Sequence, residues 1–356
     1  MSLVIESITT QVVDVPLKRP FVTALRKVTT AETVILEMRD SQGRVGHGEA
    51  APNAVVSGDT TKSIVSAIED VIAPKIIGMS LDQPDVIKSA IDDSMIHNSS
   101  PKAAVNIALN DLIAQRYQVP LYVLLGGSDN EVITDYTVSV GDTNDMINQA
   151  KQLVEDGFDT LKLKVGADSE KADFDKVAAI RNAVGSKVKI RLDANQGWHP
   201  KQAVAAIHRM ERAGLDIELV EQPVRANDFA GMKFVTQNVD TLILADESIF
   251  SVEDALRLIQ MHGCDLINLK LMKAGGIDNA LKINTLAEAA GIKCMVGSMI
   301  ESSVSVAAAA HLAAAKENIQ YVDLDAALMF SENPVSGGYV NDENRIELLN
   351  KPGLGF

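Results

Sequence analysis

From residue 136 onward, short apolar runs alternate with longer amphipathic segments at a steady interval. The segments between the runs, such as PKQAVAAIHRMERAG and SVEDALRLIQMHG, carry helical apolar spacing and end in glycine. Successive runs lie about 24 to 28 residues apart, which fits one strand plus one helix. Eight runs share this pattern, at residues 136–140, 161–166, 188–195, 217–223, 242–248, 266–271, 292–298 and 321–326. The pattern predicts an α/β fold, a TIM-like (β/α)7β barrel with its functional site at the carboxyl ends of the strands.

The residues before this repeat group their strands and helices separately. Apolar or alternating runs predict an antiparallel sheet of three strands, at residues 3–15, 32–39 and 44–50. Helical apolar spacing then predicts three helices, near residues 60–76, 83–95 and 101–117. We expect the third helix to take Ser100 as its N-cap, with Pro101 at the first helical position.

The change of pattern predicts two domains. An α+β capping domain is expected over residues 1–125, beside a barrel over residues 126–327 that carries the catalytic residues. The Gly-rich polar stretch at residues 126–130 is the predicted boundary. The loop-rich tail, from about residue 328 to residue 356, is expected to return and complete the capping domain.

Composition narrows the class of partners. The 33 Lys and Arg residues against 48 Asp and Glu residues give a formal net charge of −15, which would repel nucleic acid and anionic membrane surfaces. The first residues show no signal-peptide pattern, and no apolar run reaches the roughly 18 residues of a membrane span. Cys264 and Cys294 are too few for a disulfide framework or a structural zinc site. We therefore expect a cytoplasmic protein without a nucleic-acid or membrane partner, and we also expect a homo-oligomer.

Charged residues occupy the predicted carboxyl ends of the barrel strands, where a strand without a site would carry apolar or neutral residues. Lys162 and Lys164 lie two residues apart and therefore face the same side of one strand. Taken alone, this spacing is more typical of two solvated lysines on a surface strand. The barrel context reverses that preference and favours a site.

Asp193, Glu221 and Asp246 end three successive barrel strands, one strand-plus-helix interval apart. Because the ends of adjacent parallel strands meet, the three carboxylates should converge, and they would repel one another without a cation. Oxygen ligands with no nearby His or Cys favour Mg2+ over zinc. Each acid alone could be an ordinary loop cap or salt-bridge partner, but that explanation is a poor account of all three together.

Lys270 ends the sixth strand, roughly opposite Lys162 and Lys164 across an eight-stranded ring. A proton α to a carboxylate can be removed only if the developing enolate is stabilised, which metal coordination can do. Nearby cations would lower the pKa of a lysine base toward the working pH. Lysines on opposite faces could then remove the proton from one side and return it from the other. Lys273 is out of phase with Lys270, and we interpret it as an ordinary loop lysine.

These motifs resemble those of the enolase superfamily, in its muconate-lactonizing-enzyme-like subgroup, across almost the whole chain. The motifs are KLK (162–164), LDANQGW (192–198), VEQP (220–223), ADES (245–248), NLKLMKAGG (268–276) and GSMIE (297–301). The superfamily uses a lysine base together with Mg2+. The resemblance implies that Lys164 and Lys270 are the acid/base pair and that Lys162 assists them. It also implies that Mg2+ is held by Asp193, Glu221 and Asp246.

Further residues resemble the dipeptide epimerases of this subgroup, and specifically the L-Ala-D/L-Glu epimerases. Asp323 and Asp325 form a DxD pair on one face of the eighth strand, which suits a substrate ammonium group. Arg26 matches the family arginine that pairs with the glutamate side-chain carboxylate, although a solvated loop arginine would look the same. Thr137 and Ser298 fall where the family lines its substrate pocket.

The resemblance therefore implies a Mg2+-dependent epimerase of a small dipeptide, L-Ala-D/L-Glu above all, with a role in peptidoglycan-peptide recycling. Epimerases of hydrophobic or cationic dipeptides remain open, as do muconate cycloisomerase and o-succinylbenzoate synthase, against which the DxD pair and Arg26 argue. A non-catalytic metal- or ligand-binding barrel is the non-enzyme alternative, and it would not need two opposed lysines. GHGEAA (46–51) matches a dinucleotide-binding pattern, but it ends a predicted hairpin strand and opens no helix, so we reject it.

Overall fold

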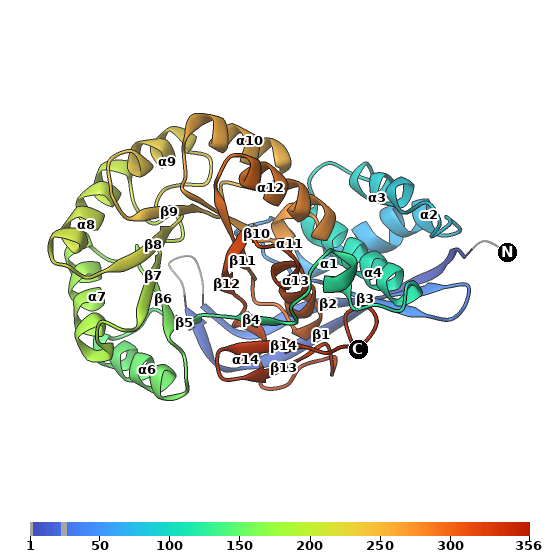
Figure 1. Ribbon diagram of the computed structural model, residues 1–356, viewed down its shortest axis with the longest axis horizontal. Coiled ribbons are helices and arrows are strands. Elements are labelled where there is room, and N and C mark those ends of the chain that lie inside the picture. Colours follow the sequence, from blue (N-terminus) through green and yellow to red (C-terminus); the bar gives the residue numbers. More distant parts are fainter. Residues whose placement is uncertain (1–2, 23–26) are drawn as a thin grey trace.

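The computed structural model describes residues 3–22 and 27–356, and its larger part is a barrel of parallel strands (Figure 1). Eight strands pair in the order β12-β11-β10-β9-β8-β7-β6-β5. The two ends of this order meet where the Asp135 N–H donates to the Val322 carbonyl (3.3 Å). The strands are β5 (Tyr136–Val138), β6 (Thr160–Lys164), β7 (Lys189–Asp193), β8 (Ile217–Glu221), β9 (Leu242–Ala245), β10 (Leu266–Lys270), β11 (Lys293–Gly297) and β12 (Ile319–Asp323).

A longer helix follows each of the first seven barrel strands, and α6 to α10 form an outer arc in Figure 1. These helices are α6 (Thr143–Glu155), α7 (Glu170–Val184), α8 (Pro200–Arg212), α9 (Phe229–Thr236), α10 (Val252–Met261), α12 (Ile277–Ala289) and α13 (Ser303–Ala315). Only the one-turn helix α14 (Ala326–Met329) follows the eighth strand, which confirms the predicted (β/α)7β barrel. No described helix has the length and apolar character needed to cross a membrane.

The smaller part is a three-stranded antiparallel sheet with helices packed on it. The sheet pairs in the order β1 (Ile5–Val22), β2 (Lys27–Asp40) and β3 (Val45–Ala50). The helical segments are α1 (Thr61–Ser66), the π-helical turn η1 (Ala67–Ile72), α2 (Ala73–Ile76), α3 (Pro84–Asp92) and α4 (Ser99–Arg116). Leu36 and Met38 of the sheet share a buried core with Ile64, Ile87 and Leu109 of the helices. We refer to described residues up to 125 as the capping region and to residues 126–327 as the barrel region.

Helix α4 lies directly on β3 because two glycines leave space for its backbone. A Cβ on Gly46 would lie 2.3 Å from the Ala108 carbonyl oxygen, and a Cβ on Gly48 would lie 2.0 Å from the Ala104 carbonyl oxygen. The glycines of GHGEAA therefore permit close helix–sheet packing. The motif lies in strand β3, as predicted when a dinucleotide-binding site was rejected.

The start of α4 differs from the prediction. Asn98 (φ 54°, ψ 52°) takes the N-cap position and the helix begins at Ser99, so the assignment of Ser100 as N-cap was wrong. Ser100 is buried instead, and its hydroxyl donates to the Ala51 carbonyl (3.2 Å). The prediction used only the local pattern of a serine before a proline. The Ser100 hydroxyl instead bonds to Ala51, which follows β3 and lies about fifty residues earlier in the chain.

The C-terminal tail packs against both regions. β13 (Tyr339–Asp342) and β14 (Arg345–Leu348) form a hairpin, and β14 pairs with β4 (Glu131–Ile133). The chain then runs back to α4, where the two oxygens of Asp111 accept the N–H groups of Leu354 and His47, each at 2.8 Å. The short helix α5 (Leu121–Leu124) begins where the Leu121 N–H donates to the Gly353 carbonyl (2.8 Å).

Candidate active site

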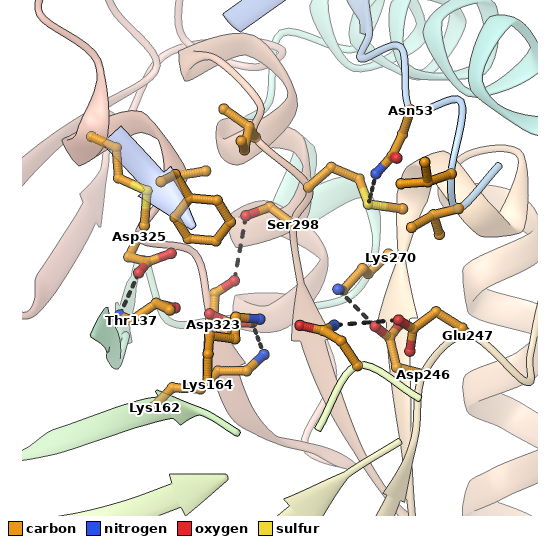
Figure 2. Close-up of a pocket in the computed structure, with 18 residues that line it drawn as sticks. Asn53, Thr137, Lys162, Lys164, Asp246, Glu247, Lys270, Ser298, Asp323 and Asp325 are labelled. Carbon is orange, nitrogen blue, oxygen red and sulfur yellow. Dashed lines mark hydrogen bonds and ion pairs between the residues drawn. The ribbon is translucent and has the colours of Figure 1, made fainter. Parts of the chain in front are cut away.

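A pocket lies at the carboxyl ends of the barrel strands, beneath residues of the capping region (Figure 2). The barrel region contributes most of the polar side chains, namely Thr137, Lys162, Lys164, Asn195, Asp246, Glu247, Lys270, Ser298, Asp323 and Asp325. The capping region contributes Phe21, Asn53, Val55 and Val56. The pocket therefore opens at the barrel end where the strand pattern predicts a site.

Two lysines point inward from β6. Lys162 Nζ lies 2.5 Å from Glu221 Oε2 and 2.7 Å from Asp323 Oδ2. Lys164 Nζ lies 2.5 Å from Asp193 Oδ2. The two lysines are 1% and 8% exposed, so the alternative of solvated lysines on a surface strand is excluded. Although burial lowers the pKa of Lys162, the carboxylates of Asp323 and Glu221 raise it well above its ordinary value.

Three carboxylates lie at adjacent strand ends. Asp193 and Glu221 are paired residues at the last positions of β7 and β8, and Asp246 directly follows β9. All three are almost fully buried. Burial and the charge of Asp193 raise the pKa of Glu221 to about 7. Burial also acts to raise the pKa of Asp246, but Lys270 and Lys273 hold it below the ordinary value.

Lys270, at the end of β10, reaches the pocket from the side opposite Lys164 (Figure 2). Its Nζ lies 2.8 Å from Asp246 Oδ2 and 4.0 Å from Glu221 Oε1. Burial and Lys162 act to lower the pKa of Lys270. The carboxylates of Asp246 and Glu221 have the larger effect and raise this pKa above its ordinary value. The expected lowering by neighbouring cations is therefore outweighed among the protein's own groups, because carboxylates are the nearest charges.

Lys273 corrects the interpretation of that residue as a loop lysine. The strand ends at Lys270 and the helix α11 (Leu271–Ala274) begins at once, so the period of two no longer applies and the helical turn brings Lys273 back to the site. Its Nζ lies 2.6 Å from Asp246 Oδ1 and donates to the Asp246 and Ile249 carbonyls. Lys273 is 1% exposed. Both oxygens of Asp246 thus contact an ammonium group.

The oxygens beside these lysines form a donor set that suits a hard divalent cation. Three buried oxygens face no donor among the described residues, namely Asn195 Oδ1, Glu247 Oε2 and Asn268 Oδ1, whereas Glu221 Oε2 and Asp246 Oδ1 each face only a lysine ammonium. Buried oxygens without donors are costly, and carboxylate and amide oxygens are the ligands that Mg2+ prefers. Within residues 3–22 and 27–356, however, no three acidic, His or Cys side chains converge on one point. Lysine ammonium groups lie beside the carboxylates in this structure. The residues therefore fit Mg2+ by the chemistry of their oxygens.

The residues predicted to bind substrate lie across the pocket from Lys270 (Figure 2). Asp325 Oδ2 accepts the Thr137 N–H (2.6 Å), and the Ser298 N–H donates to the Asp323 carbonyl (3.1 Å). Burial and Asp323 raise the pKa of Asp325 to about 7. Burial also acts to raise the pKa of Asp323, but Lys162 holds it below the ordinary value. The structure therefore brings these four residues together.

Arg26 lies outside the described residues. Three polar pocket residues were missed from the sequence: Asn53, Asn195 and Glu247. Asn195 and Glu247 stand inside the motifs LDANQGW and ADES, so their closeness to the predicted ligands could have indicated them. Burial and Asp246 raise the pKa of Glu247 to about 8. Asn53 carries no such signal, because it lies in a loop of the capping region without a repeat.

Two family descriptions match consecutive parts of the chain. Residues 7–126 match the mandelate racemase/muconate lactonizing enzyme N-terminal domain, and residues 145–356 match the enolase C-terminal domain-like family. The chain belongs to the mandelate racemase/muconate lactonizing enzyme family. The resemblance expected from the motifs is thereby confirmed. The first match ends in the Gly-rich stretch after the capping region, and the second begins within α6.

Relatives within the mandelate racemase/muconate lactonizing enzyme family cover nearly the whole chain. The L-Ala-D/L-Glu epimerase of Bacillus subtilis is 50% identical over 349 residues, or 98% of this chain and 95% of the relative. The structure of its substrate-liganded complex superimposes with a TM-score of 0.98, covering 99% of this chain and 98% of that one. The L-Ala-D/L-Glu epimerase of Clostridium acetobutylicum is 47% identical over 354 residues, 99% of both chains. A dipeptide epimerase from Enterococcus faecalis, complexed with Mg and L-Leu-L-Tyr, is 44% identical with a TM-score of 0.96, covering 100% of this chain and 99% of that one.

Proposed function

We propose that this protein is a Mg2+-dependent dipeptide epimerase that inverts the Cα of the C-terminal residue of L-Ala-D/L-Glu. The observation that carries the proposal is the placement of Lys164 and Lys270 on opposite sides of one pocket, each against a buried carboxylate. Two lysines on opposite sides suit a reaction that takes a proton from one face of a carbon and returns one to the other. Relatives that are 47% and 50% identical to this chain are L-Ala-D/L-Glu epimerases, which supports the same substrate.

The proton transfer needs one lysine in each protonation state. The neutral lysine takes the Cα proton, and the electron pair of the C–H bond moves into the adjoining substrate carboxylate as an enolate forms. The other lysine, as an ammonium, gives a proton to the opposite face of the same carbon. One proton leaves and one arrives, so the substrate is inverted and the two lysines exchange protonation states. In the reverse direction Lys164 and Lys270 exchange roles.

Asp193, Glu221 and Asp246 are the residues that would hold Mg2+, as their position at three adjacent strand ends supports. Bound Mg2+ would neutralise negative charge that grows on the substrate carboxylate. Lys162 would add a fixed positive charge beside Glu221, which it contacts at 2.5 Å, and so assist the same stabilisation.

Substrate selection would depend on the other side of the pocket. Asp323 and Asp325 would bind the dipeptide ammonium, with Thr137 and Ser298 beside them. Muconate and o-succinylbenzoate chemistry has no ammonium group, so two buried carboxylates at this place favour a dipeptide. Arg26 would pair with the glutamate side chain, because a guanidinium binds a carboxylate through two parallel hydrogen bonds.

A hydrophobic dipeptide is the second candidate substrate, and the apolar part of the pocket favours it. That part consists of Phe21, Val55, Val56, Met299, Ile300, Ala326 and Met329. A relative from Enterococcus faecalis that is 45% identical over 344 residues is a hydrophobic dipeptide epimerase. Because these residues offer no charged partner to a glutamate side chain, we assign a preference for glutamate to Arg26.

We also propose the remaining assignments made from the sequence. The capping domain is assigned to residues 1–125, completed by the tail from about residue 328, and the barrel to residues 126–327. The end of the first family match at residue 126 supports this boundary. A cytoplasmic homo-oligomer that acts in peptidoglycan-peptide recycling is the setting we propose. The buried free thiols of Cys264 and Cys294 suit a reducing compartment.

The proposal is tested with a dipeptide library in D2O. The Mg2+-loaded protein should place deuterium on the Cα of the C-terminal residue, fastest with L-Ala-L-Glu and L-Ala-D-Glu, as measured by mass spectrometry. Faster labelling of dipeptides that end in an apolar residue would favour the second candidate. The control is the double variant Lys164→Ala/Lys270→Ala, which should label none. Absence of labelling in every dipeptide would contradict both candidates.

A further inference from the structure

The loop between β11 and α13 forms one wall of the pocket. Ser298, Met299 and Ile300 of this loop line the pocket, and Ser302 then occupies the N-cap position of α13. The Ser302 side chain makes no cap hydrogen bond to the helix. The first N–H groups of a helix need acceptors, so acceptors for this buried helix end must come from elsewhere.

Glu49 provides them from the capping region. It lies on β3, and its Oε1 accepts the Ser302 N–H (2.6 Å) and the Thr33 hydroxyl (2.7 Å). Its Oε2 accepts the Ser302 hydroxyl (2.7 Å) and the Ser305 N–H (2.9 Å). Glu49 is fully buried, and these four donors fill the acceptor positions of its carboxylate. A negative group at this place is also stabilised by the positive end of the helix dipole.

The same loop is held at its middle and at its start. Glu301 Oε1 accepts the Met299 N–H (2.6 Å), which folds the loop back on itself. The Ser298 N–H donates to the Asp323 carbonyl (3.1 Å). Ile300 packs in a small cluster with Val15 of the capping region. The loop therefore depends on Glu49 for its far end, while its apolar tip lies against the capping sheet.

We propose that Glu49 is a positioning residue for substrate binding: from the capping region it holds the loop of residues 298–302 in the place where that loop contacts the dipeptide. The inference rests on the proposed function for the identity of the substrate. The described hydrogen bonds of Glu49 go to Thr33, Ser302 and Ser305, and none of these is assigned to proton transfer or to Mg2+. Its action is on the shape of the pocket wall, through Ser302 and the backbone that leads to Met299 and Ile300.

A carboxamide in place of the carboxylate distinguishes this role. In Glu49→Gln the side chain keeps its size, but one end becomes an NH2 donor that faces either the Ser302 N–H or the Ser305 N–H. Two donors then face each other, so the end of the loop must move. A misplacement of about 1 Å at a substrate-contacting group can cost 100-fold. We expect the KM for the best dipeptide to rise about 10-fold or more, with kcat within about threefold, because the bases are not displaced.

A merely structural role would produce a different result. Loss of folded protein lowers kcat and leaves KM unchanged, since the remaining folded molecules bind as before. Asn106→Ala is the matched control. Asn106 of α4 is also buried and also joins the two regions, because its Oδ1 accepts the Ile277 N–H (2.8 Å) and its Nδ2 donates to Asp278 (2.8 Å). None of these three residues lines the pocket, so Asn106→Ala should lower Tm without changing KM.

Two further measurements keep the proposal testable. Thr33→Val removes one hydroxyl donor to Glu49 at nearly constant volume, and it should shift KM in the same direction by a smaller factor. It decides the question if Glu49→Gln does not fold. Hydrogen–deuterium exchange of residues 298–305 should be faster in Glu49→Gln than in wild type, while residues 277–284 stay unchanged.

The outcomes separate this proposal from the proposed function. A KM within twofold of wild type in the folded Glu49→Gln protein, or in Thr33→Val when only that variant folds, would overturn the positioning role. Wild-type protein that turns over no dipeptide would instead contradict the proposed function. In that case exchange alone decides about the loop, and unchanged exchange at residues 298–305 would show that Glu49 does not hold it.

Discussion

The two walls of the pocket differ in what they present to a ligand. The barrel wall carries the buried ammonium groups of Lys162, Lys164 and Lys270 against carboxylates of neighbouring strands. The capping wall carries Phe21, Val55 and Val56, with Asn53 as its only polar side chain among the described pocket residues. Charge at fixed places suits proton transfer, whereas an apolar surface suits selection by shape. We therefore expect the barrel wall to carry the proton transfer and to bind the dipeptide ammonium, and the capping wall to select among dipeptide side chains.

The two walls should also respond differently to substitution. On the barrel wall Lys162, Lys164 and Lys270 are each paired with a buried carboxylate, so removing one lysine leaves its partner uncompensated, and such losses are large. On the capping wall most contacts are apolar and local, so a substitution there should change which dipeptide is accepted.

Removal of Mg2+ should have the largest effect. Exhaustive chelation should abolish turnover of every dipeptide, because charge on the substrate carboxylate then lacks its principal stabiliser, and added Mg2+ should restore the activity. Turnover is followed by polarimetry or by mass spectrometry in D2O. The circular dichroism of the chelated protein should match that of the loaded protein. Full turnover after chelation would remove the assignment of Asp193, Glu221 and Asp246 as ligands.

Loss of a single base should lower kcat by about 100- to 10,000-fold, the usual contribution of general acid–base catalysis. In D2O, Lys164→Ala should still exchange the α-proton of one epimer through Lys270, and Lys270→Ala should exchange that of the other. The two variants serve as controls for each other. Equal exchange of both epimers by both variants would show that the lysines are not the two bases.

The sequence allowed most of the barrel wall to be predicted. Lys162, Lys164, Asp193, Glu221 and Lys270 stand at strand ends that recur with a regular interval, and a residue's phase in a strand decides which way it points. In the structure the three lysines line one pocket, and Asp193 and Glu221 are buried in contact with them. Their roles remain predictions that the experiments above test.

What could not be predicted has physical reasons. Lys273 was misplaced because strand periodicity was extended past Lys270, the last strand residue, into a helical turn that begins at Leu271. The role of Glu49 depends on Ser302, 253 residues away, and no local pattern reports such a contact. In the sequence, Glu49 stood out only as a member of GHGEAA (46–51), the dinucleotide-binding pattern that we rejected.

The proposed selection of glutamate is tested most directly by substitution of Arg26. A glutamate carboxylate that leaves water needs a charged partner, and removing one partner of a desolvated pair costs about 2 to 5 kcal/mol, or roughly 30- to 4000-fold. We expect Arg26→Ala to lose kcat/KM for Ala-Glu within that range, while Ala-Ala and Ala-Met change little. The control dipeptides lack the carboxylate that Arg26 would bind.

Two other results would change the comparison of the walls. Parallel losses on all dipeptides would mean that Arg26 supports the pocket as a whole and does not select glutamate. No loss on any dipeptide would leave the apolar wall to decide selectivity, as in the second candidate function.

The smallest effect is expected where the two regions meet away from both walls. His311 of α13 is fully buried, and its Nδ1 accepts the Tyr122 N–H (3.0 Å) from the capping region. Burial lowers the pKa of His311 to about 4. The folded state therefore binds fewer protons than the unfolded chain between about pH 6.5 and pH 4, so stability falls as the pH falls through that window. The shift corresponds to about 3 kcal/mol of unfolding free energy lost from pH 7 to pH 4.

His311→Asn keeps an acceptor near the Tyr122 N–H but cannot gain a proton. The variant loses packing at every pH, yet its unfolding free energy should fall less than that of wild type as the pH decreases from 7 to 4, as measured by urea denaturation. The buried acids Glu49 and Glu301 have raised pKa values and act with the opposite sign, but they are present in both proteins and cancel in the difference. At pH 7 kcat/KM should be unchanged, because His311 lies in neither wall.

Parallel stability curves for the two proteins would mean that His311 does not resist protonation in the folded state. A changed kcat/KM would mean that the junction and the pocket are coupled, so the separation of the two walls would no longer describe this protein.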